Sequence, residues 1–84
     1  MTDQFSMTIM HNGKQIDCTI DLIRSTYSYQ LKVSFDDYAL FFEPDEEGSY
    51  RMVVMPWQDK NQLDKLDKSL INNIVETLQR ELQS

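Results

Sequence analysis

The sequence predicts an α+β fold, a five-stranded antiparallel β-meander with one C-terminal α-helix packed on one face. Three observations support this prediction. Apolar and polar residues alternate with a period of two up to about residue 55, which is the pattern of half-buried strands. Short turn sequences interrupt the alternation at intervals. From residue 66 onward, the apolar residues recur at helical spacing instead.

Length and composition bound the class of protein. The chain has 84 residues, the size of one small domain, so we treat residues 1–84 as a single unit. It carries 14 acidic and 8 basic residues and a formal net charge of −6, which argues against nucleic-acid binding. A single cysteine excludes an internal disulfide and a zinc site built on several thiolates. No apolar run approaches the ~18 residues of a membrane span, and we expect no membrane partner.

The first predicted hairpin joins strands near residues 5–11 and 15–24. Asn12-Gly13 between them favours a two-residue type I′ turn, which needs positive φ at both central positions. A slip of one residue would turn the apolar set of one strand to the opposite face of the sheet. The register that avoids this slip pairs Ile9 with Ile16, Met7 with Cys18, and Phe5 with Ile20.

The third and fourth strands are predicted near residues 28–35 and 38–44. Asp36-Asp37 forms a plausible tight turn between them, which places Val33 opposite Leu40 and Leu31 opposite Phe42. The turn between the second and third strands has weaker chemistry. Pairing Leu22 with Tyr29 keeps the core residues on one face and leaves Ser25-Thr26 at the tip of a looser loop.

The last hairpin leads into a strand near residues 49–55. Asp45-Glu46-Glu47-Gly48 fits a type I turn followed by Gly48 in the left-handed region, a three-residue loop with a G1 bulge. This loop length pairs Phe42 with Met52, Leu40 with Val54, and Glu43 with Arg51. Other loop lengths would place a polar residue opposite Phe42.

The C-terminal segment is predicted to be helical after Pro56 ends the last strand. Two helix starts compete: Asp59 with Gln62 gives a capping-box pattern, and Asp67 is flanked by a hydrophobic staple. We expect a main helix at about 68–82 and leave open an extra turn near 59–65. The helix must cover an apolar sheet face. The face available carries Ile9, Ile16, Ile20, Leu31, Val33, Leu40, Phe42, Met52 and Val54.

Few residues of the chain are candidates for catalysis, metal binding or cofactor binding. His11, the only histidine, lies beside the first turn with no partner implied by spacing, and we expect it to be exposed and idle. Cys18 falls on the core face, where a thiol is inert. The acidic run 45–47 lacks the ligand spacing of a calcium loop, and both glycines belong to turns. We therefore expect no catalytic residue, no cofactor, no metal and no enzymatic activity.

Apolar residues on the outer sheet face form a candidate interaction surface. The register places Phe41 directly opposite Val53 there, with Met55 farther along the strand and Trp57 just beyond it. Contiguous exposed apolar residues usually mark an interface. The competing interpretation is that the sheet curls strongly, or that segment 56–66 folds back so that Trp57 and Leu63 cover these residues, and both interpretations stay open. The last strand carries only one charge, Arg51, so it also suits pairing with a second chain as an unprotected edge.

The hairpin from Phe42 to Arg51 resembles that of a group of small uncharacterised bacterial proteins. The resemblance covers about residues 8–82 and includes the apolar strand and the helix from Asp67 to Leu82. It implies the same meander and C-terminal helix, and it implies no activity. The N-terminus lacks the basic start and apolar run of a signal peptide, and the single cysteine suits a reducing compartment, so we expect a cytoplasmic location.

The sequence favours a non-enzymatic protein-interaction module that self-associates, as in a homodimer, or binds another protein. The surface is the outer sheet face with Phe41, Val53, Met55 and Trp57, or the last strand. Its acidity favours a basic partner. An alternative is a small-molecule carrier with an apolar slot between sheet and helix, lined by Tyr27, Tyr29 and Tyr50. A third interpretation is an acidic decoy that occupies a basic site on another protein.

Overall fold

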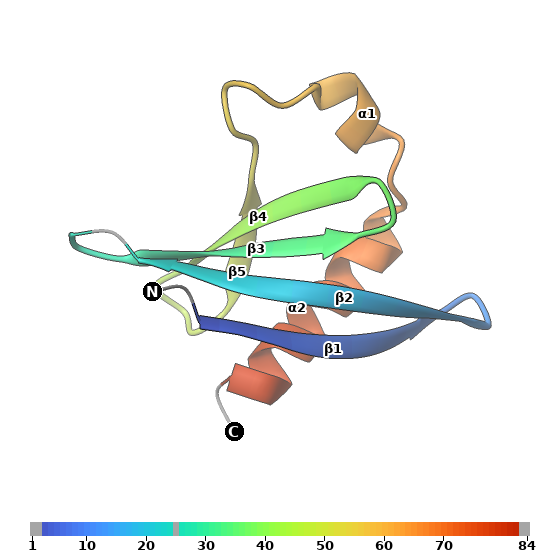
Figure 1. The fold of residues 1–84 in the computed structure, drawn as a ribbon, viewed down its shortest axis with the longest axis horizontal. Coiled ribbons are helices and arrows are strands. Elements are labelled where there is room, and N and C mark those ends of the chain that lie inside the picture. Colours follow the sequence, from blue (N-terminus) through green and yellow to red (C-terminus); the bar gives the residue numbers. More distant parts are fainter. Residues whose placement is uncertain (1–2, 25, 83–84) are drawn as a thin grey trace.

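The fold is the predicted five-stranded antiparallel sheet with a C-terminal helix on one face (Figure 1). The computed structural model describes residues 3–24 and 26–82. The strands follow one another in the sheet in chain order and run β1 (Asp3–His11), β2 (Lys14–Arg24), β3 (Tyr29–Phe35), β4 (Tyr38–Pro44) and β5 (Tyr50–Val53). No helix within the described residues is long and apolar enough to cross a membrane.

The predicted register is confirmed in the first hairpin. Asn12 and Gly13 have φ values of 51° and 77°, the left-handed pair that a type I′ turn requires. The apolar pairs on the helix side are those expected, Ile9 with Ile16, Met7 with Cys18, and Phe5 with Ile20. The predicted pairs farther along the sheet are also present: Val33 with Leu40, Leu31 with Phe42, and Phe42 with Met52. The charged pair Glu43 with Arg51 is present as well.

The predicted pairing between β2 and β3 is wrong by two residues. Leu22 pairs with Leu31, and Tyr29 pairs with Arg24. The connection therefore spans residues 25–28, with the predicted tip residue Ser25 outside the described residues. A shift of two leaves every side chain on its original face, so the alternation of apolar residues does not distinguish the two registers.

Strand β5 is shorter than predicted because the side chain of Gln58 replaces its continuation. The backbone N–H of Met55 donates to Gln58 Oε1 at 2.9 Å, and Gln58 Nε2 donates to the carbonyl of Ala39 at 2.7 Å. The amide therefore stands between β4 and the chain after β5, where direct ladder bonds would otherwise form. Val54 is 44% exposed and does not pair with Leu40, which corrects the expected core.

Both predicted helix starts are used. The short helix α1 (Lys60–Asp64) begins after Asp59, whose carboxylate accepts from the Asn61 N–H at 3.0 Å. The main helix α2 (Lys68–Leu82) matches the predicted residues 68–82. Asp67 Oδ1 accepts from the Ser69 N–H at 3.0 Å and satisfies one of the unpaired donors of the first turn.

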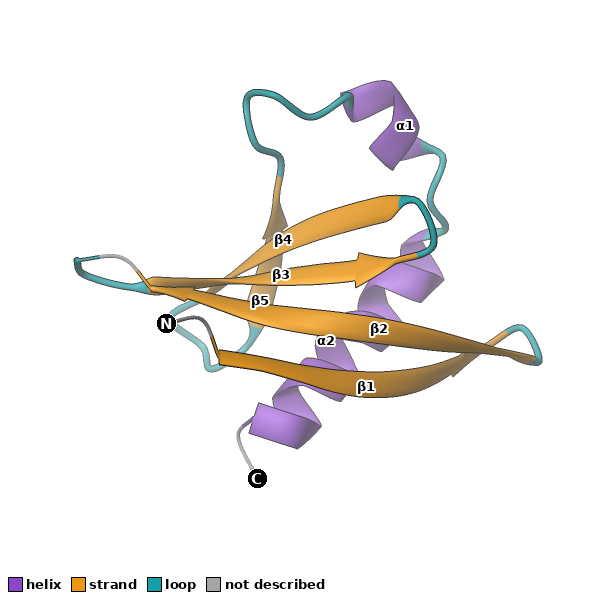
Figure 2. Ribbon diagram, viewed as in Figure 1, coloured by secondary structure: helices purple, strands orange, loops and turns teal. Residues whose placement is uncertain are grey.

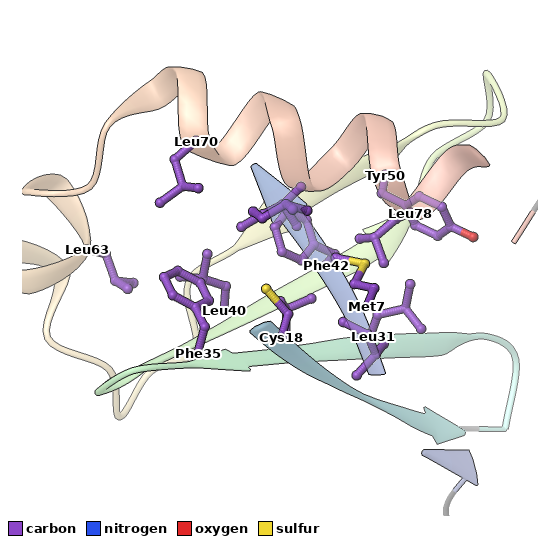
Figure 3. Packing of buried hydrophobic residues seen from close by; sticks show 14 residues of the cluster. Met7, Cys18, Leu31, Phe35, Leu40, Phe42, Tyr50, Leu63, Leu70 and Leu78 are labelled. Carbon is purple, nitrogen blue, oxygen red and sulfur yellow. The ribbon is translucent and has the colours of Figure 1, made fainter. Parts of the chain in front are cut away.

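The core lies between the sheet and α2 (Figure 2). It is fully excluded from solvent at Ile20, Val33, Phe42, Ile74 and Leu78. Figure 3 shows that Leu63 of α1 points toward Phe35 and Leu40 and closes one end of this core. Segment 56–66 thus contributes Leu63 to the helix side of the sheet and not to the outer face.

Candidate functional site

Trp57 is the exposed centre of the predicted interaction surface. Its side chain is 67% exposed, and its ring meets the Phe41 ring edge-on, with centroids 5.4 Å apart and an interplanar angle of 86°. Phe41 is only 5% exposed, while Val53 and Met55 are half-buried. Phe41 therefore packs against the indole ring, and Trp57 is the most exposed member of the set.

The position of Trp57 is fixed by the turn that contains it. The Gln58 N–H donates to the carbonyl of Met55 at 3.0 Å, which closes a turn over residues 55–58. The side chain of Gln58 fastens the same turn to Ala39 of β4. Pro56 restricts its own φ and adds local stiffness. The indole is thus presented on a constrained turn, which reduces the conformational entropy lost when a partner binds it.

Segment 56–66 covers part of the outer sheet face. Trp57 does fold back and cover Phe41, as the covering interpretation expects. Leu63, which was expected to help, turns into the main core instead. The result is a smaller apolar surface than the sequence suggested, with Trp57 as its most exposed member and Val53 and Met55 half-buried.

A shallow hollow of about 310 Å³ lies beside Trp57. Asp37 and Tyr38 from the start of β4, and Asp59 and Gln62 from the start of α1, contribute to its lining. Both carboxylates are exposed at this hollow. The combination of an exposed indole with two acidic groups favours a positively charged group, because a cation interacts with the face of an indole as well as with carboxylates.

A larger cleft of about 650 Å³ opens between the sheet and the C-terminal end of α2. Its lining includes Phe5, Leu22, Tyr29, Tyr50 and Leu82. The hydroxyls of Tyr29 and Tyr50 are 3.2 Å apart, and this hydrogen bond, with burial, raises the pKa of Tyr29 to about 12.

The mouth of this cleft carries charge. Arg24 Nη2 lies 3.2 Å from Asp3 Oδ2, and both side chains are exposed there. Tyr27, the third tyrosine expected in such a slot, is 97% exposed in the β2–β3 connection and does not line the cleft.

His11 is not the exposed residue that the sequence suggested. Its side chain is 14% exposed, and its Nε2 lies 3.6 Å from Asp67 Oδ2 without a hydrogen bond. Hydrogen bonds from Ser69, together with the nearby His11, hold the pKa of the Asp67 carboxyl below its ordinary value. The first turn and the start of α2 come together only in the tertiary structure, so sequence spacing gave no sign of this contact.

The other chemistry-bearing groups have structural roles. Cys18 is buried, and burial, followed by the charges of Asp17 and Asp36, raises the pKa of its thiol to about 11. Asp45 Oδ1 accepts from the N–H groups of Glu47 and Ser49 at 2.9 and 2.8 Å, so the acidic run builds its own turn. Among the described residues, no three His, Cys, Asp or Glu side chains gather in a way that would hold a metal.

Gln58 and Asp37 are the important residues that sequence reasoning missed. No local pattern reveals that Gln58 inserts into the sheet. Asp37 was detectable in principle, because the predicted register places the start of β4 next to the chain that follows β5. Comparison of the chain with protein-family models, with curated proteins and with solved structures gave no match.

Proposed function

We propose that this chain is a non-enzymatic protein-interaction module that binds a basic segment of a partner protein through Trp57. The single observation that carries the proposal is the indole, two-thirds exposed yet held on a constrained turn against Phe41. Tryptophan is the residue most enriched among those that dominate binding energy at protein interfaces. Trp57 is not an isolated exposed residue, because it lies against Phe41, which pairs with the half-buried Val53, and contiguous apolar residues are those that mark interfaces.

The charge around Trp57 supports a basic partner. Asp37 and Asp59 line the adjacent hollow, and the whole chain carries a net charge of −6. A lysine or arginine of the partner would lie over the indole and near these carboxylates, while an adjacent apolar side chain would contact Val53 and Met55. The same charges oppose a nucleic-acid partner.

The fluorescence of Trp57 tests the proposal directly, since it is the only tryptophan in the chain. We expect a short peptide with alternating arginine and leucine to change the emission in a saturable manner. The change should weaken as salt is added, because exposed charges are screened. A peptide of the same length with glutamate in place of arginine should have no effect. Equal responses to both peptides, or no response to either, would refute a basic partner.

Tyr27 provides a matched control for Trp57. Both aromatic side chains are strongly exposed, but Tyr27 lies in the β2–β3 connection, away from the hollow. The variant Trp57→Ala should lose binding of the basic peptide, measured by calorimetry, while Tyr27→Ala should keep it. Both variants should remain folded by circular dichroism, because neither side chain belongs to the core.

The cleft beside Tyr29 supports a second candidate function, a carrier of a small amphipathic molecule. Its volume of about 650 Å³ lies within the range of ligand sites, and two phenol groups and an Arg24–Asp3 pair offer polar contacts. A thermal-shift screen with fatty acids and aromatic acids tests it. A saturable rise in melting temperature that disappears in Tyr29→Phe but persists in Trp57→Ala would favour the carrier over the interaction module.

We further propose that the protein acts in a reducing compartment such as the cytoplasm. Cys18 supports this, because it is a free thiol buried in the core, with no disulfide partner in the sequence.

A further inference from the structure

The two edges of the sheet differ greatly in length and protection. Edge strand β5 has four residues, and Gln58 interrupts its continuation. Edge strand β1 has nine residues, Asp3–His11, and is the outermost strand on its side of the sheet in Figure 2. Between its two ends β1 contains no charged residue, proline or glycine. Proteins usually protect exposed edges with such residues to prevent pairing with other chains. The edge of β1 lacks this protection and can pair with another strand.

The turn at Asn12-Gly13 determines which backbone groups of β1 face outward. His11 and Lys14 flank this two-residue turn and therefore form a hydrogen-bonded pair. Residues at odd positions then bond to β2, and residues at even positions direct their N–H and C=O groups away from the sheet. The carbonyl of Met10 agrees with this parity, because it accepts from Asn73 Nδ2 of α2 at 2.7 Å.

The hydrogen bond from Asn73 to Met10 limits the stretch of β1 whose outward backbone groups are available to another strand. Asn73 occupies the carbonyl of Met10 and places the side of α2 next to that position. Within residues 3–24 and 26–82, no hydrogen bond reaches the outward backbone groups of Gln4, Ser6 or Thr8. These three residues therefore offer a ladder of donors and acceptors to another strand.

We propose that β1 pairs antiparallel with β1 of a second copy of this chain, about a two-fold axis at Ser6. In this register Ser6 faces its own copy, Gln4 faces Thr8, and Phe5 faces Met7 of the second copy. Pairing stops before Met10, where Asn73 occupies the edge. The sheets of the two copies then become one, with α2 of each copy on the same face.

The uncharged centre of β1 is the part of this acidic chain that a second copy can approach without repulsion between charges on the two strands. A net charge of −6 makes two copies repel each other across most of their surface. The strip formed by Gln4, Ser6 and Thr8 carries no charge of its own, and the side chains of Gln4 and Thr8 donate to Asp21 and Asp17 of β2, so its contribution to pairing comes from the backbone groups. Phe5 is only half-buried in one copy and gains an apolar neighbour in the other.

The area of contact sets the expected strength of this dimer. Pairing of five residues from each copy buries less than the roughly 1,000 Å² that stable complexes need. We therefore expect a reversible dimer whose population rises with concentration. This edge is separate from the Trp57 surface, so Trp57→Ala should leave the dimer unchanged.

Single-cysteine variants test the register. In a hydrogen-bonded antiparallel pair the Cα atoms are about 5.5 Å apart, which suits a disulfide. Ser6→Cys should therefore form a disulfide-linked dimer under mild oxidation. Gln4→Cys and Thr8→Cys are matched controls, since both are exposed on the same strand and face but lie opposite each other. Alone, each should remain uncrosslinked, and a mixture of the two should crosslink.

The pattern of crosslinks decides the outcome. Equal crosslinking of all three single variants, or preferential crosslinking of Thr8→Cys, would overturn the proposed register. Buried Cys18 is common to all variants and contributes equally to the background.

Light scattering on the unmodified chain tests the dimer itself. Its mass should rise from one chain toward two as concentration increases. Ser6→Pro removes an outward N–H that the monomer does not use, so it should fold and dimerise at least about tenfold more weakly. Ser6→Lys places like charges opposite each other and gives the same result without changing the backbone. A monomeric native chain at all concentrations, or native-like dimers in both variants, would overturn the proposal.

Discussion

Gln58 is the residue on which the geometry of the Trp57 surface depends. Its side-chain amide joins Met55 to Ala39, with one hydrogen bond accepted and one donated. A carboxylate at this position would still accept from Met55 but would have no proton to donate to Ala39. The single exposed aromatic residue that defines the candidate site is thus positioned by its neighbour in the sequence.

Substitution of Gln58 should therefore loosen Trp57 without unfolding the sheet. We expect Gln58→Ala to lower the free energy of unfolding by about 1–2 kcal/mol, and Gln58→Glu to lower it as well. Acrylamide should quench the Trp57 emission more efficiently in both variants. Gln62→Ala, at an exposed residue of the same hollow, should change neither measurement. Unchanged quenching in Gln58→Glu would contradict the positioning role.

Two raised pKa values predict weaker folding in alkali. Burial raises the pKa of Cys18 from 9.0 to about 11, and the hydrogen bond to Tyr50 raises the pKa of Tyr29 from 10.0 to about 12. The folded state thus binds these protons more tightly than the unfolded chain. Their contribution is complete below pH 9 and is lost as the pH rises toward 12. Urea midpoints should fall above pH 9, and less steeply in Tyr29→Phe than in Tyr27→Phe.

The start of α2 shows how an element depends on one capping residue. Asp67 accepts the Ser69 N–H, and this hydrogen bond lowers the pKa of Asp67. The cap therefore stabilises folding above the ordinary carboxyl pKa of 3.8 and loses this effect as the pH falls through the lower, folded value. Asp67→Asn keeps an acceptor oxygen without the titration.

The two Asp67 variants should separate capping from charge. We expect Asp67→Ala to lower the melting temperature at pH 7 and Asp67→Asn to lower it less. As the pH falls below the ordinary carboxyl pKa of 3.8, the melting temperature should fall less steeply in Asp67→Asn than in the native chain. Parallel curves for the native chain and Asp67→Asn would show that this carboxylate is not coupled to folding.

The elements differ in how far the sequence determined them. Asn12-Gly13 and Asp45–Gly48 demand particular backbone conformations, so the registers next to them followed from turn chemistry. The β2–β3 connection has no such residues. Its predicted pairing was wrong by two residues, and a shift of two residues keeps every side chain on the same face, so the alternation of apolar residues could not reveal it. Strand β5 ends early because the side chain of Gln58 takes the place of its next ladder bonds. No local sequence pattern predicts this insertion.

For the molecule as a whole, residues that maintain the fold are separate from those proposed to bind. Ile74 is fully buried between α2 and the sheet, whereas Trp57 rests on the outer face. A small domain has a total stability of roughly 5–10 kcal/mol. Ile74→Ala should cost about 2–5 kcal/mol, a large share of that total, measured by urea unfolding. Trp57→Ala should cost less, and a larger cost would make Trp57 a structural residue.

The separation explains why the candidate site was harder to predict than the fold. Apolar alternation and turn residues were enough to identify the face that α2 covers. The same alternation identified Phe41, Val53, Met55 and Trp57 as neighbours, but not which of them stays exposed. That depends on the 55–58 turn and on Leu63, which joins the core, and both are settled by tertiary contacts.

Nuclear magnetic resonance of the isotope-labelled chain with the arginine–leucine peptide would show directly whether a basic peptide binds at Trp57. We expect the peptide to shift the single indole N–H resonance and the amide resonances of Asp37, Gln58 and Asp59, at the surface that contains Trp57. Signals of Gln4, Ser6 and Thr8 should respond to protein concentration and not to the peptide. Peptide-induced shifts confined to the Tyr29 cleft, or an indole resonance that does not move, would contradict an interaction module centred on Trp57.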